Sequence, residues 1–195
     1  MRKKTNLKYQ LVISISVICV LSPISAGQTI IYVDSCADPC GNGQSWAKAY
    51  QYLQDALTDA NTTAKPVEIW VASGIYKPSV KVDGISDRHK AFQMINGVAI
   101  YGGFAGDEPN TFDVNNRDLT SNETILSGDL LGNDTPGLDP CDLLTDLSRS
   151  ENCCHIFHHP IGTNLEPNAV IDGFTIKAGN ADYADWPHYN GGGII

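Results

Sequence analysis

Three histidines lie within five residues of one another in the stretch HIFHHP: His155, His158 and His159. Imidazole nitrogens are common ligands of transition metals, so this cluster is a candidate metal site. On a strand, His155 and His159 would share one face with Phe157, and His158 would point to the opposite face. The alternative interpretation is that all three are corner and surface histidines. The sequence has no C-x-x-C pair, which argues against a zinc site built on cysteines.

An acidic stretch, GDLLGNDTPGLDPCD, gathers oxygen ligands in one predicted loop. Ca²⁺ prefers such oxygen clusters, so it is the one cofactor that the sequence suggests. The spacing fits neither an EF-hand loop nor a glycine-rich nonapeptide repeat, and a plain acidic turn is the alternative. The candidate ligands are Asp129, Asn133, Asp134, Asp139 and Asp142.

Basic and aromatic side chains complete the set of chemical candidates. Five scattered bases after residue 66 are candidates for a role in catalysis, and the alternative is that they are solvated surface groups: Lys77, Lys81, Arg88, Lys90 and Lys177. The segment YADWPHYNGGG carries rings that either form a sugar-stacking platform or fold back over the protein; they are Tyr183, Trp186, His188 and Tyr189. Neither a G-x-S-x-G motif nor a P-loop is present, so the catalytic residues stay unassigned.

The first 26 of the 195 residues have the layout of a secretory signal peptide. A basic start is followed by the apolar run Leu11 to Leu21 and by small residues that end at Ala26. The run is shorter than the roughly 20 residues that span a bilayer, although a membrane anchor is the alternative. We therefore predict a secreted or cell-surface protein, with a signal peptide over 1–26 and no transmembrane segment in the mature chain.

The mature chain is strongly acidic. Four of the 13 Lys and Arg residues lie in the first 26 residues and none of the 22 Asp and Glu does, so nine basic residues remain and the net charge is −13. Such a surface disfavours nucleic acid, whose binding depends on phosphate neutralisation. It also repels acidic polysaccharides unless a cation bridges them or basic residues cluster locally. Export makes disulfides plausible; the remaining cysteines are Cys36, Cys40, Cys141, Cys153 and Cys154, and their pairing stays open.

Hydrophobic periodicity predicts one helix among short strands. Trp46, Tyr50, Leu53, Leu57 and Ala60 recur at steps of three and four residues, which places them on one helical face. Ser45 is the expected N-cap, and Asn61 to Pro66 should end the helix. The predicted strands are 29–34, 67–72, two around Asn96-Gly97, and those in ETILSGD, CHIFHHP and NAVIDGFTIKAG.

Several strands end at a glycine: Gly74, Gly102, Gly128 and Gly173. Their separations of 28, 26 and 45 residues favour a coiled solenoid in which each glycine supplies a left-handed corner. We therefore expect an all-β right-handed parallel β-helix, with an N-terminal strand and amphipathic capping helix over 27–66 and the first coils over 67–195. A β-sandwich is the alternative.

From Ile30 to Ile195 the sequence resembles the N-terminal part of secreted bacterial parallel β-helix proteins of the pectin-lyase-like superfamily. The matching stretches are IYVDSCA, GNGQSWAKAYQYLQDAL, EIWVASGIYKP, FQMINGVAIYGGFAGDE, RDLTSNETILSGD and AVIDGFTIKAGNA. The final GGGII resembles the corner repeats of those proteins and is similar to repeats of polymorphic outer-membrane proteins. The resemblance implies further coils beyond Ile195, so we expect the chain to be an N-terminal fragment.

The resemblance leaves two classes of function open. The first is a secreted or cell-surface scaffold and binding protein, adhesin-like, with a polysaccharide or cell-surface glycan as partner and no catalytic site in this segment. The second is a polysaccharide lyase or glycoside hydrolase whose active site lies beyond residue 195. Enzymes of that superfamily use a basic residue beside a uronate carboxylate, often with Ca²⁺, and related hydrolases use paired carboxylates.

Overall fold

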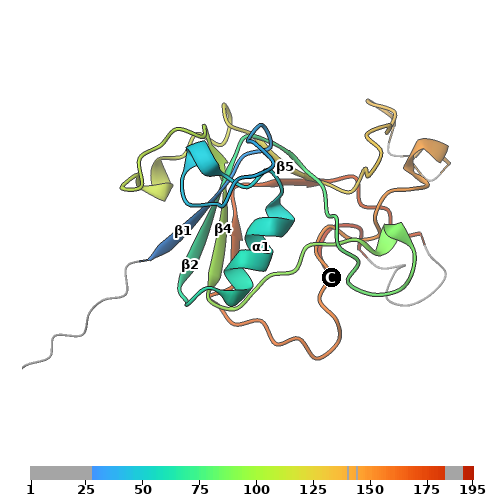
Figure 1. Cartoon of the computed structure of the whole chain (residues 1–195). Helices are drawn as coiled ribbons and strands as arrows, with labels where there is room; N and C mark the ends of the chain where they lie inside the picture. Colours follow the sequence, from blue (N-terminus) through green and yellow to red (C-terminus); the bar gives the residue numbers. More distant parts are fainter. Residues whose placement is uncertain (1–27, 140, 144, 183–190) are drawn as a thin grey trace, which may run out of the picture.

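The structure is a computed structural model that describes residues 28–139, 141–143, 145–182 and 191–195. The predicted signal peptide over 1–26 lies outside these residues. Two parallel sheets, one α-helix and long connecting loops make up the described part (Figure 1). No helix within the described residues is long and apolar enough to cross a membrane.

The larger sheet has four parallel strands in the order β1-β2-β4-β6. Their bounds are Thr29–Val33 (β1), Val67–Ala72 (β2), Val98–Phe104 (β4) and Val170–Asp172 (β6). The register stacks an isoleucine of each strand on the next, in the series Ile31, Ile69, Ile100 and Ile171. This ladder of branched apolar side chains faces the main core, which explains why β2 and its neighbours are rich in Val and Ile.

The smaller sheet has three parallel strands in the order β3-β5-β7. They run over Gly74–Tyr76 (β3), Thr124–Ser127 (β5) and Thr175–Lys177 (β7). Tyr76, Leu126 and Ile176 are paired across it and pack against the same core as the larger sheet.

Helix α1, Leu53–Thr62, covers the larger sheet next to β1 and β2 (Figure 1). Its buried residues are Leu53, Ala56, Leu57 and Ala60, the part of the predicted stripe that follows residue 52. The small alanines allow the helix to approach Val67, Ile69 and Val71 of β2 closely, and all of these residues share one core.

The predicted start of this helix at Ser45 is wrong. Trp46–Lys48 forms a separate 3₁₀ helix, η1, and the chain then extends so that Tyr50 pairs with Val33. The amide of Tyr50 donates to the carbonyl of Tyr32 at 2.9 Å, a bond that a continuous helix would break. Further 3₁₀ turns are Asp87–His89 (η2), Val114–Asn116 (η3) and Leu147–Arg149 (η4).

Trp46, the first residue of the predicted stripe, packs on the other face of the larger sheet, whereas Tyr50 packs against the core under α1. On that other face, Trp70 stacks on Phe104 with ring centroids 4.7 Å apart, and Trp46 meets Tyr32 edge to face at 4.8 Å. These rings form a second buried cluster, separate from the core under α1. The recurring apolar residues are therefore buried or partly buried, as predicted, but they pack in two separate clusters on opposite faces of the larger sheet.

The expected all-β solenoid is also wrong. Of the residues that the structure describes, 14% are helical and 23% are in strands or bridges, with short parallel strands in two sheets and one α-helix, which is an α/β-type arrangement. A solenoid stacks repeats of similar structure, so corresponding segments of successive coils should form corresponding strands. The segment expected to supply the CHIFHHP strand instead forms only single bridges through Phe157, to Phe92 and to Ile194.

The predicted glycine corners have two different physical origins. Gly74 and Gly173 do have positive φ, at 150° and 82°. Gly102 lies inside β4, and neither it nor Gly128 is among the residues with positive φ. At both of these positions an added Cβ would lie 2.5 Å from a carbonyl oxygen, of Gly173 or of Ala178. Close backbone packing, and not a left-handed turn, therefore requires these two glycines.

Candidate functional site

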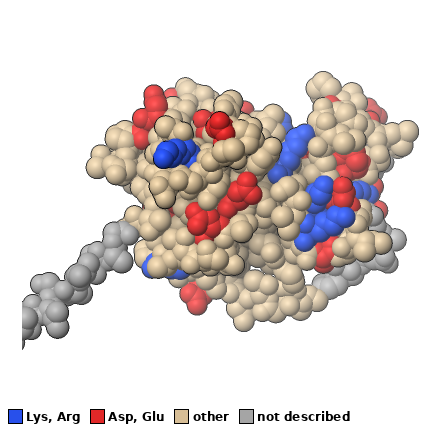
Figure 2. Space-filling view, viewed as in Figure 1, with Lys and Arg blue, Asp and Glu red and all other residues tan. Residues whose placement is uncertain are grey.

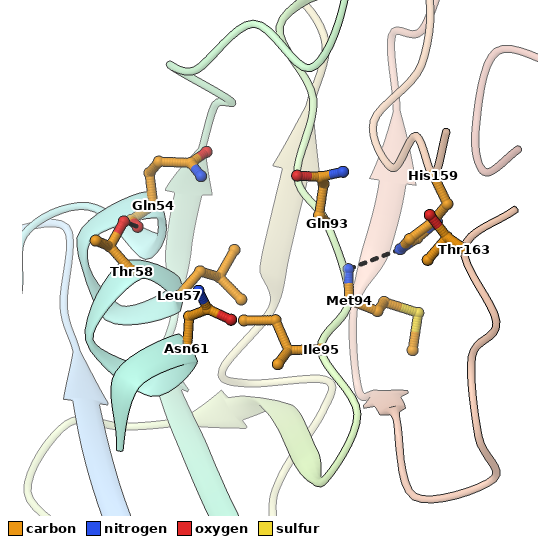
Figure 3. Close-up of a pocket in the computed structure, with 9 residues that line it drawn as sticks. All are labelled: Gln54, Leu57, Thr58, Asn61, Gln93, Met94, Ile95, His159 and Thr163. Carbon is orange, nitrogen blue, oxygen red and sulfur yellow. Dashed lines mark hydrogen bonds between the residues drawn. The ribbon is translucent and has the colours of Figure 1, made fainter. Parts of the chain in front are cut away.

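The side of α1 next to its buried face lines a pocket of about 320 Å³, which we call the amide pocket (Figure 3). Gln54, Leu57, Thr58 and Asn61 contribute from the helix. Their spacing of three, one and three residues places them on one side of α1. Leu57 is 3% exposed and belongs both to the core and to the pocket wall.

The facing wall is the extended segment Gln93 to Ile95, and the loop that holds His159 and Thr163 closes the third side. Backbone hydrogen bonds fix these two segments together. Phe92 donates to the carbonyl of Ile156 at 2.8 Å, and its own carbonyl accepts from the amide of His158 at 3.1 Å. The wall is therefore held in place although it forms no regular strand.

His159 is held in one tautomer by its neighbour. The Met94 amide donates to Nε2 of His159 at 2.8 Å, so Nε2 acts as an acceptor and carries no proton (Figure 3). Burial lowers the pKa of His159, and a backbone hydrogen bond with Ile195 opposes that effect without cancelling it. The imidazole is therefore neutral at pH 7, and its lone pair is already used.

The lining of the amide pocket is polar but uncharged. None of its nine described residues is Asp, Glu, Lys or Arg. Carboxamides stand on both main walls, with Gln54 and Gln93 extending into the space between α1 and the facing segment (Figure 3). Within the described residues, Oε1 of Gln54 is buried and has no hydrogen-bond partner. A buried acceptor of this kind is satisfied when a ligand brings a donor to it.

This arrangement suits binding better than catalysis. Each carboxamide offers both donors and acceptors, as does the hydroxyl of Thr163. The hydroxyl of Thr58 donates to the carbonyl of Gln54 at 2.9 Å and remains available as an acceptor. Leu57, Met94 and Ile95 supply apolar surface. The described lining holds no carboxylate and no thiol, and His159 already accepts a hydrogen bond. Paired carboxylates or an available base, which glycosidases and lyases need, are therefore missing from these walls.

The three sequence-predicted histidines do not form one site. His155 and His158 lie with their rings 5.4 Å apart, while His159 faces the amide pocket. Nδ1 of His155 lies 2.8 Å from the carbonyl oxygen of Gly191, and Nδ1 of His158 lies 3.6 Å from a carboxylate oxygen of Asp83. The predicted alternation failed because this segment is not a strand.

Two carboxylates of the acidic loop, those of Asp129 and Asp134, accept hydrogen bonds from the protein itself. Burial pulls the pKa of Asp129 upward, but backbone amides of Gly132, Asn133 and Asp134 donate to the carboxylate and bring its pKa below the ordinary value. Both carboxylate oxygens of Asp134 accept from the side-chain amide of Asn152, at 3.1 and 3.0 Å. Within the described part of the chain, no group of three or more His, Cys, Asp or Glu side chains is placed to hold a metal ion.

The five scattered bases lie in three kinds of environment: between loops, at the surface and along a groove. Arg88 donates to the carbonyls of Asn152 and Asn180 at 2.8 and 2.6 Å, so it joins distant loops. Lys177 lies on β7 and is exposed, and Lys81 forms a surface ion pair. Lys77 and Lys90, in contrast, line one groove at the start of α1.

All five described cysteines are free thiols. Cys153 and Cys154 are buried, and burial raises the pKa of Cys153 to about 12. Both thiols therefore stay protonated and inert at neutral pH. Those of Cys36, Cys40 and Cys141 are exposed.

The proposed aromatic platform, Tyr183, Trp186, His188 and Tyr189, lies outside the described residues.

The carboxamides of the amide pocket were not recognised from the sequence, because Gln and Asn on the outer side of an amphipathic helix look like ordinary solvated residues. The signal that was available is the stripe Gln54, Thr58 and Asn61, which is polar yet free of charge.

A scan against protein-family models found no match, and neither did searches among curated proteins and solved structures. The fold is thus described by its own geometry, as an α/β-type arrangement of two small parallel sheets with one helix. The family resemblance of the sequence stays a prediction.

Proposed function

We propose that this protein is a secreted or cell-surface binding protein, adhesin-like in its role, that holds a carbohydrate ligand in the amide pocket. The observation that carries the proposal is the uncharged lining, with carboxamides on both main walls and a buried acceptor at Gln54. Sugar hydroxyls donate and accept hydrogen bonds, as carboxamides do, and a neutral sugar needs no counter-charge. The predicted signal peptide over 1–26 supports an extracellular location.

The proposal is tested with the exported, processed protein on a glycan array, followed by calorimetric titration of the glycans that bind. We expect Gln54→Leu and Gln93→Leu each to weaken binding about fivefold to tenfold, since each removes one or two hydrogen bonds to the ligand. Gln44→Leu is the matched control, because Gln44 is exposed, as Gln93 is, but lies in the loop after β1, away from the pocket.

Stability supplies an independent criterion. Because Oε1 of Gln54 has no partner among the described residues, Gln54→Leu should leave the melting temperature unchanged or raise it. Weaker binding with unimpaired stability would support a role in ligand contact. Parent-like binding by both pocket variants would contradict the proposal. Release of shortened or unsaturated sugar products would instead support the lyase or hydrolase alternative.

A further inference from the structure

A second space, which we call the lysine groove, lies at the N-terminal end of α1 and has a volume of about 430 Å³. Gln51 and Tyr52 contribute from the residues before the helix. Ile75, Lys77 and Ser79 contribute from β3 and the loop that follows it, and Lys90 contributes from the segment after η2. It is larger than the amide pocket, and no step of the proposed function uses it.

The lysine groove and the amide pocket are lined by neighbouring residues of α1 and of the segment that faces it. On α1, Leu53 lines the groove and the next residue, Gln54, lines the pocket. On the facing segment, Lys90 lines the groove and Gln93 lines the pocket. Three residues of extended chain span about 10 Å. A ligand longer than one sugar unit can therefore contact both spaces.

The two spaces differ in charge. Lys77 and Lys90 line the groove, and none of its described lining residues is acidic. Lys77 forms no hydrogen bond or salt bridge within the described part of the chain, but its charge helps to lower the pKa of the nearby Asp129 carboxyl. This positive site lies on a protein whose chain after residue 26 has a net charge of −13. Figure 2 shows more Lys and Arg side chains on the right-hand part of this face than on the left, with Asp and Glu side chains among them.

The counter-charge beside Lys90 is incomplete. Lys90 lies 3.0 Å from one carboxylate oxygen of Asp87, and Lys81 lies 2.9 Å from the other. Two ammonium groups thus share one carboxylate, which is 66% exposed and therefore binds each of them weakly. Three lysines, Lys77, Lys81 and Lys90, thus face two carboxylates, Asp87 and Asp129, and an anionic ligand group entering the groove meets the remaining positive charge.

The groove also offers a surface for a ring. The side chains of Tyr52 and Ile75 remain 55% and 53% exposed although they are large and apolar. Tyr76 beside them is buried, and its hydroxyl donates to the carbonyl of Ala72 at 2.9 Å, so it is fixed in place. An exposed tyrosine on a fixed support suits the apolar face of a sugar.

We propose that the two spaces form one extended site for an acidic oligosaccharide. A neutral sugar unit occupies the amide pocket, and a unit that carries a carboxylate or sulfate group lies on Tyr52 with its anion between Lys77 and Lys90. This inference rests on the proposed carbohydrate-binding function and adds the charge and the minimum length of the ligand.

The test uses the exported protein and an array of oligosaccharides in matched neutral, carboxylated and sulfated forms. We expect the acidic forms to bind about tenfold more tightly than their neutral counterparts, with a preference that falls as salt is added. Lys77→Gln and Lys90→Gln should abolish this preference and leave the neutral forms bound as before. Comparison of the carboxylated and sulfated arms identifies the anion.

Lys81→Gln is the matched control, since Lys81 pairs with the same Asp87 but does not line the groove. A loss of acidic-glycan binding in Lys81→Gln as large as in the groove variants would indicate diffuse surface attraction and overturn the inference. Equal binding of neutral and acidic forms would also overturn it, while the proposed function would stand. No binding to any glycan would overturn both.

Discussion

Replacement of Gly173 by alanine tests the close packing between the two sheets. Gly173 joins β6 to β7 with a φ of 82°, a conformation that costs a residue with a side chain roughly 1–2 kcal/mol. An added Cβ would also lie 2.7 Å from the carbonyl oxygen of Gly102 and 2.7 Å from Nη1 of Arg117. Forcing atoms into such a space costs about 1–3 kcal/mol. We therefore expect Gly173→Ala to destabilise the fold by about 2–5 kcal/mol.

Gly137→Ala separates the two contributions. Gly137 has a φ of 72°, but an added Cβ there would have no neighbour within 4 Å among the described residues. This variant should lose only the conformational part, about 1–2 kcal/mol. Urea unfolding followed by circular dichroism measures both free energies, and the midpoint of Gly173→Ala should fall by about 1–2 M with an unchanged slope. Equal losses in the two variants would refute the packing argument.

Three further predictions concern the side chains of Arg117, His159 and Cys153. Arg117→Met should cost about 1.5–3 kcal/mol in urea unfolding, because the guanidinium donates to the Gly102 carbonyl at 2.7 Å and lies 4.9 Å from the Tyr101 ring centroid. Since the folded-state pKa of His159 is lowered, the stability it contributes is present above about pH 6.5 and falls as pH drops from there toward the folded pKa. His159→Gln should therefore flatten the melting temperature between pH 7 and 5, and an unchanged slope would contradict this. Iodoacetamide at pH 8 should spare Cys153 until urea is added, as mass spectrometry of the labelled peptides can check.

The sequence predicted individual elements better than their assembly. The β-branched run Val67–Ala72 is a strand with the predicted bounds, because its side chains are buried on both faces of the sheet. The stripe from Leu53 to Ala60 is helical as expected. Ser45 misled the prediction, since tertiary contacts of Trp46 and Tyr50 outweigh the local helix signal.

Assembly depends on contacts that spacing alone does not encode. Gly102 and Gly128 were interpreted as corners, but glycine is required at both positions because a backbone carbonyl lies too close for a side chain. The amide pocket combines Gln54 and Gln93 with His159, which lies far along the sequence, so no local pattern marks it. Lys77 and Lys90 looked scattered for the same reason.

Leu57 belongs to the core and to the amide pocket at once, and this links the mobility of α1 to occupancy of the site. When the helix opens locally, the pocket loses one wall together with the core contact. A bound ligand consequently favours the closed helix by mass action. The rate of amide hydrogen exchange in Leu53–Thr62 should thus fall as ligand occupancy rises, so that exchange in this helix reports on ligand binding.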